Sequence, residues 1–425
     1  MIAYGSVLQT GVQSLLALAA GWAAARWRAL DPEPAVAQLN LFVLRVCIPA
    51  LQVWLLAVKT DMRRADNWRV IGAFLCWSLS LQALAAAWQL ARRGRLDAAR
   101  LGVDSLVLST NNTGILGPVV LQAALGPRYA PLGMLATVVL YFQQLPSAAV
   151  LFDYHRRHAD AQHAHAEGAP LLVSKAEGWE QQQPQQQQHA GGKQSPPPRP
   201  GGGDAEACEV GGGAEWGAAA AAAGAGSPQH PRHAQHHQEQ QQRTAAGGGA
   251  RHAADGGALL LMARNPMVWS TAAALLLSCC GSAALLEPTS PAHPRALGFV
   301  EPLLAWFAGC TAPVTLFCTG LWAHGKEIAG GAAGRELAAY TALRATLGPA
   351  VMVLLARLLG FSGDLAAALV ILSVLPVAQT AFVICKQYDV GTATVTGAMV
   401  ASLLAMLPQL MATLWLLEAS GVFAQ

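Results

Sequence analysis

Charged residues are scarce in this sequence, since only 12% of its 425 residues are Asp, Glu, Lys or Arg. The net charge is +3, and no basic run with interleaved aromatic residues occurs, which argues against a nucleic-acid partner. The chain also lacks a phosphate-binding GxxxxGK[ST] loop, a nucleophile elbow and a cluster of metal ligands in its apolar stretches. We therefore predict no enzymatic activity, no cofactor and no metal site.

Hydrophobic residues, by contrast, make up 53% of the chain and gather into long runs. Each run has about 20 residues or more, which is enough to cross a hydrocarbon core of about 30 Å at 1.5 Å per residue. We predict an all-α polytopic membrane protein in the lipid bilayer. Its ten transmembrane helices are expected at residues 6–25, 38–58, 68–91, 101–125, 131–152, 266–286, 297–323, 337–359, 363–386 and 392–416.

A polar, low-complexity stretch divides these runs into two groups of five. It contains QQQPQQQQ and SPPPRPGGG. Such a composition cannot bury enough apolar surface to offset the entropy lost when a chain is ordered. The predicted organisation is an N-terminal membrane repeat at residues 1–152, a disordered linker at 153–257 and a C-terminal membrane repeat at 258–425.

Two of the ten runs, the fourth and the ninth, are interrupted by polar residues or proline. Proline removes a backbone donor, and broken backbone inside a bilayer needs partners from protein or water. Two broken helices in matching places indicate the substrate site of a transporter. The residues at these breaks are therefore predicted to contact substrate: Asn111, Asn112 and Thr113 in the fourth run, and Pro376, Gln379 and Thr380 in the ninth.

The two halves of the chain repeat at a constant offset. Pro49 and Pro313 are 264 positions apart, and so are Asn112 and Pro376. Because each half has an odd number of spans, the second half enters the membrane from the opposite side. We predict two inverted five-helix repeats whose broken fourth and ninth helices cross near the midplane.

The distribution of basic residues in the loops predicts the orientation. If the N-terminus is outside, the inner loops and flanks hold twelve Lys and Arg residues and the outer loops hold seven. Positive charge accumulates on the cytosolic side of membrane proteins. Both termini are therefore expected outside the cytosol and the long linker inside it.

Two arginines fall within the apolar runs, where a charge is costly and is a functional candidate by default. Arg45 is close to the helix break expected at Pro49, and it is a candidate anion-attracting residue. Arg344 is about a third of the way along the eighth run. We interpret Arg344 as a structural residue whose guanidinium reaches the headgroups.

Several motifs resemble those of the PIN-type auxin efflux carriers of the membrane transport protein superfamily. LPVAQTAFVICKQYDV resembles the family pattern LPxGxxPFVFAKEYxV, RNPMVWSTAAALL resembles RNPNTYSSLIGL, and STNNTGILGPVVLQAALG resembles TLPNTLVMGIPLLxxxYG. The two crossover prolines of the family are replaced by Asn111 and Ala381. The chain is therefore identified as a divergent member.

The resemblance implies a homodimer that exports the anion indole-3-acetate by an elevator-like movement, driven by the membrane potential. It also implies that Asn112 and, less strongly, Asn265 contact the carboxylate. Ile48, Leu51 and Val314 are candidates for an apolar slot around the aromatic ring, with ordinary helix packing as the alternative. The long linker favours the plasma membrane, with the endoplasmic reticulum membrane as the alternative.

Two other functions fit the same sequence pattern. A sodium- or proton-coupled organic-anion transporter of the same fold would need an ion gradient for transport. A non-transporting membrane sensor or scaffold would instead depend on the linker, so that removal of residues 160–250 would abolish its function.

Overall fold

The computed structural model describes residues 3–168, 265–325 and 331–423. The description below concerns the compact unit to which the described residues up to His163 and from Asn265 onward belong. Within the described residues the chain is helical and has no strand. The prediction of an all-α polytopic membrane protein is confirmed.

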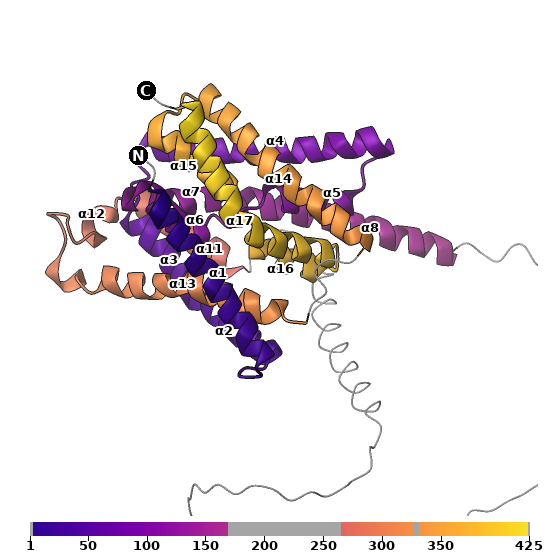
Figure 1. Ribbon diagram of the computed structural model, residues 1–425, viewed down its shortest axis with the longest axis horizontal. Coiled ribbons are helices and arrows are strands. Elements are labelled where there is room, and N and C mark those ends of the chain that lie inside the picture. Colours follow the sequence, from indigo (N-terminus) through magenta and orange to yellow (C-terminus); the bar gives the residue numbers. More distant parts are fainter. Residues whose placement is uncertain (1–2, 169–264, 326–330, 424–425) are drawn as a thin grey trace, which may run out of the picture. The chain divides into compact units, whose positions relative to one another are not determined.

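The first five predicted spans correspond to helices between Tyr4 and Gly168 (Figure 1). They are α1 (Tyr4–Arg26), the continuous helix α2–η1–α3–η2 (Pro32–Phe42, Val43–Cys47, Ile48–Gln52, Val53–Val58), α4 (Ala65–Arg93), the broken pair α5 (Ala98–Ser109) and α6 (Leu116–Leu125), and η3–α7–η4–α8 (Pro127–Tyr129, Ala130–Val139, Leu140–Gln144, Leu145–Gly168). Helix α8 therefore continues past residue 152, the predicted end of the first repeat. The rest of the predicted linker lies outside the described residues.

The last five predicted spans correspond to helices between Pro266 and Ser420. They are α11 (Pro266–Cys279) with the short α12 (Ala283–Leu286), η5 (Arg295–Leu297) with α13 (Val300–Ala323), α14 (Gly331–Leu358), the broken pair α15 (Gly363–Ser373) and α16 (Gln379–Tyr388), and α17 (Thr392–Ser420). Among the described helices, seven are long and apolar enough to cross a membrane, and α6, α11 and α15 are shorter apolar helices.

The fourth and ninth spans are broken where the sequence predicts it. Helix α5 ends at Ser109 and α6 begins at Leu116, while α15 ends at Ser373 and α16 begins at Gln379. The six residues between α5 and α6 and the five between α15 and α16 are the crossover segments. They hold four of the six residues that we predict at the breaks, and the other two begin α16.

Two other prolines do not break their helices. Pro49 lies in α3, which continues without a gap into π-helical turns at η1 and η2 on either side. Pro313 lies inside α13. A π-helical turn changes the backbone hydrogen-bond pattern locally, and this accommodates the missing proline donor without ending the helix. The break expected at Pro49 is thus wrong.

The packing of the helices is repeated in the two halves (Figure 1). Helix α4 packs against α5 and α7, and α14 packs in the same way against α15 and α17. Helix α1 packs against α13, and its counterpart α11 packs against α3 and η2. This correspondence, helix for helix, fits the predicted pair of five-helix repeats.

The contact between α1 and α13 brings two backbones together. A Cβ atom added at Gly320 would lie 1.9 Å from the Leu18 carbonyl oxygen, and one added at Gly21 would lie 2.0 Å from the Phe317 carbonyl oxygen. Small residues allow this close approach, on which helix association in a bilayer depends. Helices α1 and α13 therefore form a closely packed pair.

Candidate functional site

The two crossover segments run antiparallel and hydrogen-bond to each other. Asn111 and Val377 form an isolated antiparallel bridge. The backbone N–H of Asn112 donates to the carbonyl of Pro376 at 2.7 Å. Backbone freed by the helix breaks is therefore paired within the protein, as a hydrocarbon surrounding requires.

The Asn111 side chain is engaged in this crossover. Its Nδ2 donates to the carbonyl oxygens of Leu372 and Ser373, both at 2.9 Å. These carbonyls belong to the last turn of α15, and the last carbonyls of a helix have no N–H donor within the helix. Asn111 is 3% exposed, so its amide joins the two broken helices rather than facing an open space.

Arg344, on α14, lies at the same crossover. Its Nη1 donates to the carbonyl oxygens of Val107 and Thr110, and its Nη2 donates to Asn111 Oδ1 and, at 2.6 Å, to the Leu375 carbonyl. The side chain is 7% exposed. The interpretation that Arg344 reaches the headgroups is therefore wrong: its guanidinium is buried where α5 and α15 end.

Asn112 has different surroundings from its neighbour. Its residue is 8% exposed, and the described hydrogen bonds include none to its side-chain amide. Buried amides are normally hydrogen-bonded. The Asn112 side chain, four residues before the start of α6, is an exception to this rule within the described structure.

The beginning of α16 contacts a row of hydroxyl groups on α13. Gln379 Nε2 donates to the Thr315 carbonyl at 3.3 Å and to Thr319 Oγ1. The hydroxyl oxygens of Thr311, Thr315 and Thr380 are buried and have no hydrogen-bond partner within the described structure. Thr311, Thr315 and Thr319 follow one another at intervals of four residues along α13, so they share one face of this helix. This polar face was not singled out from the sequence, although its spacing is a readable signal.

Two further predicted residues have structural hydrogen bonds. Thr113 Oγ1 lies 2.9 Å from Thr137 Oγ1 on α7. Asn265 is the N-cap of α11, and its Oδ1 accepts from the Met267 N–H at 3.0 Å. A cap uses the Asn265 oxygen and leaves the Nδ2 donors for other partners.

The predicted apolar residues divide between two parts of the core. Ile48 is buried in the cluster that contains Ala378 of the crossover, and Val314 packs against that cluster. Leu51 is buried in the other cluster. Arg45 is exposed on η1 and takes no part in the hydrogen bonds of the crossover.

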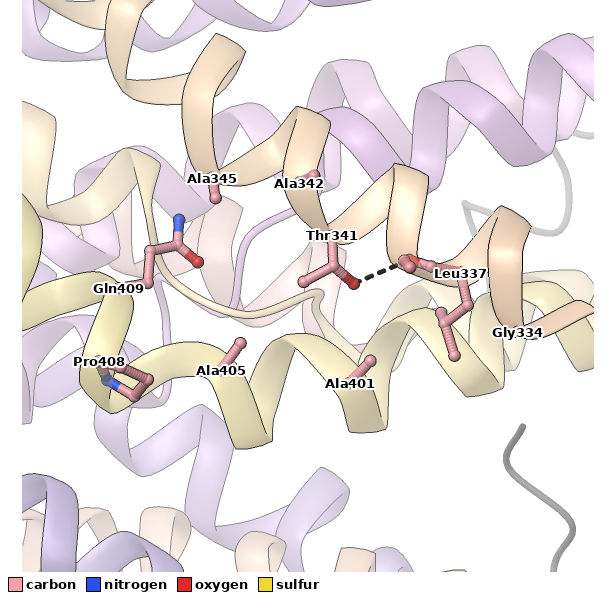
Figure 2. Close-up of a pocket in the computed structure, with 10 residues that line it drawn as sticks. Gly334, Leu337, Thr341, Ala342, Ala345, Ala401, Ala405, Pro408 and Gln409 are labelled. Atoms are coloured by element: carbon pink, nitrogen blue, oxygen red, sulfur yellow. Dashed lines mark hydrogen bonds between the residues drawn. The ribbon is translucent and has the colours of Figure 1, made fainter. Parts of the chain in front are cut away.

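A cavity of about 540 Å³ lies between α14 and α17 (Figure 2). Alanines from both helices line it, and its polar groups are Thr341 and Gln409. The Thr341 hydroxyl donates to the Leu337 carbonyl at 2.9 Å within α14. The cavity is therefore almost wholly apolar, and it holds none of the predicted site residues.

A family model described as "Membrane transport protein" matches residues 6–415, which include both repeats and the crossover. The chain belongs to the membrane transport protein family. It is accordingly an integral membrane protein of a family of transporters. No curated protein matches the chain closely enough to be named as a relative.

Proposed function

We propose that this member of the membrane transport protein family is a secondary carrier that exports an organic anion bearing a carboxylate, with indole-3-acetate as its cargo. The observation that carries the proposal is the unpartnered side-chain amide of Asn112, within the crossover segment that precedes α6. The substrate identity comes from the motifs that resemble those of auxin carriers.

The crossover supplies donors without a permanent ion pair. The first turn of a helix presents free N–H groups and a partial positive charge of about half a unit, which together bind anions. Asn112 Nδ2 adds side-chain donors at α6, and the free Thr380 hydroxyl adds one at α16. Arg344 already donates to four oxygens, three in the crossover segments and one, the Val107 carbonyl, in the last turn of α5. A carboxylate held in this way can leave again, as a transport cycle requires.

The aromatic part of the cargo needs an apolar surface next to these donors. Ile48 and Val314 belong to the cluster around the crossover residue Ala378, and they are the proposed lining of the slot. Asn265 is the proposed second amide contact through its Nδ2 atom. Leu51, which lies in the other cluster, is the weaker of the predicted apolar candidates.

Movement of the crossover relative to α13 would alternate access to the site. Gln379 connects α16 to α13 by hydrogen bonds to Thr315 and Thr319. Buried hydroxyls one and two turns away, at Thr315 and Thr311, offer further partners along the same face. We propose an elevator-like movement of the broken helices in a homodimer, at the plasma membrane, with the termini outside the cytosol.

Export of labelled substrate from cells tests the cargo directly. Cells with the carrier should release indole-3-acetate faster than cells without it, and they should not release the neutral indole-3-acetamide faster. The amide keeps the ring and loses the charge, so it serves as the matched control for anion recognition. Equal release of both compounds, or of neither from a surface-resident carrier, would contradict the proposal.

A further inference from the structure

Arg344 is the only buried cationic side chain within the described part of the chain. It lies ten residues after Gly334, where the membrane-crossing part of α14 begins, which places it about 15 Å along that part at 1.5 Å per residue. Taking a guanidinium so deep into a membrane protein is costly unless its hydrogen bonds are satisfied. No described carboxylate forms an ion pair with Arg344.

The compensation comes instead from the carboxyl ends of two broken helices. Val107 and Thr110 are at the end of α5, and Leu375 follows the end of α15. Carbonyls at a helix end have no partners within the helix. Each end also carries about half a negative charge. Two converging ends therefore present about one negative charge, which one guanidinium balances.

Carriers with broken helices place a coupling cation against such groups, namely unwound carbonyls and the carboxyl ends of half-helices. Oxygen ligands of this kind suit hard cations. Here the guanidinium of Arg344 already holds the four oxygens. We infer that Arg344 is a built-in cation that stands where a coupling ion would bind, so that this carrier works without a free metal cation.

In the anion export proposed above, on which this step rests, Arg344 stays with the carrier throughout the cycle. A cation that is part of the chain cannot be released with the cargo. Each transport cycle would then move the charge of the anion alone, and sodium could not drive it. The sodium-coupled alternative would need a separate cation site.

The first test needs no substrate and uses the thermal stability of the purified carrier at constant ionic strength. The wild type should melt at the same temperature in choline chloride and in sodium chloride. Arg344→Ala should melt lower in choline and should regain at least about 3 °C with sodium or with millimolar guanidinium, because an ion that binds only the folded state stabilises it. Arg357→Ala is the matched control, since Arg357 is exposed on the same helix.

Two results would overturn the inference. Stabilisation of the wild type by sodium would show that a free cation binds despite Arg344. No response of a folded Arg344→Ala protein to sodium, potassium or guanidinium would show that the vacated position takes no cation.

A second pair of variants decides the matter if the alanine variant does not fold. Arg344→Lys keeps the charge, whereas Arg344→Gln keeps a hydrogen-bonding amide without charge. If Arg344 acts through its charge, the lysine variant should be the more stable. The reverse order would show that Arg344 contributes hydrogen bonds and that its charge is not needed.

Transport provides an independent arm. Export by the wild type should be equal in sodium, potassium and choline media, and sodium-dependent export would contradict the inference alone. Absence of any indole-3-acetate export would contradict the proposed function and would leave the stability results standing.

Discussion

Asn112 and Pro376 are joined by a backbone hydrogen bond of 2.7 Å, although they are 264 positions apart in sequence. They are also equivalent residues of the two repeats, because the same offset relates Pro49 to Pro313. Equivalent residues that touch must lie next to the axis relating the repeats. The two broken helices therefore cross on this axis, where transporters built from inverted repeats hold their substrate.

Asn111 and Asn112 should respond differently to alanine substitution. Asn111→Ala removes two bonds to α15 and one to Arg344, and it leaves buried polar groups without partners. We expect a loss of about 3 kcal/mol or more in the free energy of unfolding. Asn112→Ala should change stability little. Thermal melting of the purified variants measures both effects, and the opposite order would show that we have assigned the structural and ligand-binding roles the wrong way round.

The glycine at position 320 should tolerate no side chain. Gly320→Ala puts a Cβ atom against the Leu18 carbonyl, which belongs to rigid helix backbone. We expect α1 and α13 to separate and the melting temperature to fall. Gly309→Ala, on the same helix, meets nothing within 4 Å and is the control. Equal stability of the two variants would contradict the close packing of α1 and α13.

Asn265 should have a cap role and a substrate role that substitution can separate. Asn265→Ala removes the cap of α11 and should cost about 1 kcal/mol. Asn265→Ser keeps a capping oxygen and loses the amide donors. The serine variant should therefore keep its stability while export slows. Unchanged export by Asn265→Ser would remove this residue from the substrate site.

Export of a monovalent anion without a coupled cation should follow the membrane potential. Moving one charge across a potential of 100 mV changes its free energy by about 2.3 kcal/mol. At equilibrium this corresponds to about a 50-fold ratio of the anion concentrations on the two sides of the membrane. Proteoliposomes with an imposed potassium diffusion potential measure this ratio. Accumulation that ignores the sign of the potential would indicate an electroneutral carrier.

The sequence predicted much of the fold because its breaks have local causes. Asn111 to Thr113 and Pro376 interrupt runs that are otherwise apolar, and the structure ends α5 and α15 at these places. The constant offset of 264 positions also predicted that the two breaks are equivalent. Pro49 misled us, since π-helical turns absorb a proline without any signal in the residues around it.

The position of Arg344 could not be read in the same way. We predicted that its span begins at residue 337, close to Gly334, where the part of α14 that is apolar enough to cross a membrane begins. The hydropathy therefore placed Arg344 along the helix and left open which groups its side chain meets. Which helix face meets the crossover also depends on packing between distant parts of the chain. The hydrogen bonds to Val107 and Leu375 are therefore visible only in the structure.

The most direct test of the central claim is export of labelled indole-3-acetate by Asn112→Ala beside the wild type, with Asn40→Ala on α2 as the control. All three proteins should reach the cell surface in equal amounts. We predict that the wild type and Asn40→Ala export the anion, while Asn112→Ala loses at least about tenfold in rate, as expected for one lost hydrogen bond to a charged group. Undiminished export by Asn112→Ala would contradict the assignment of the crossover amide as the carboxylate site.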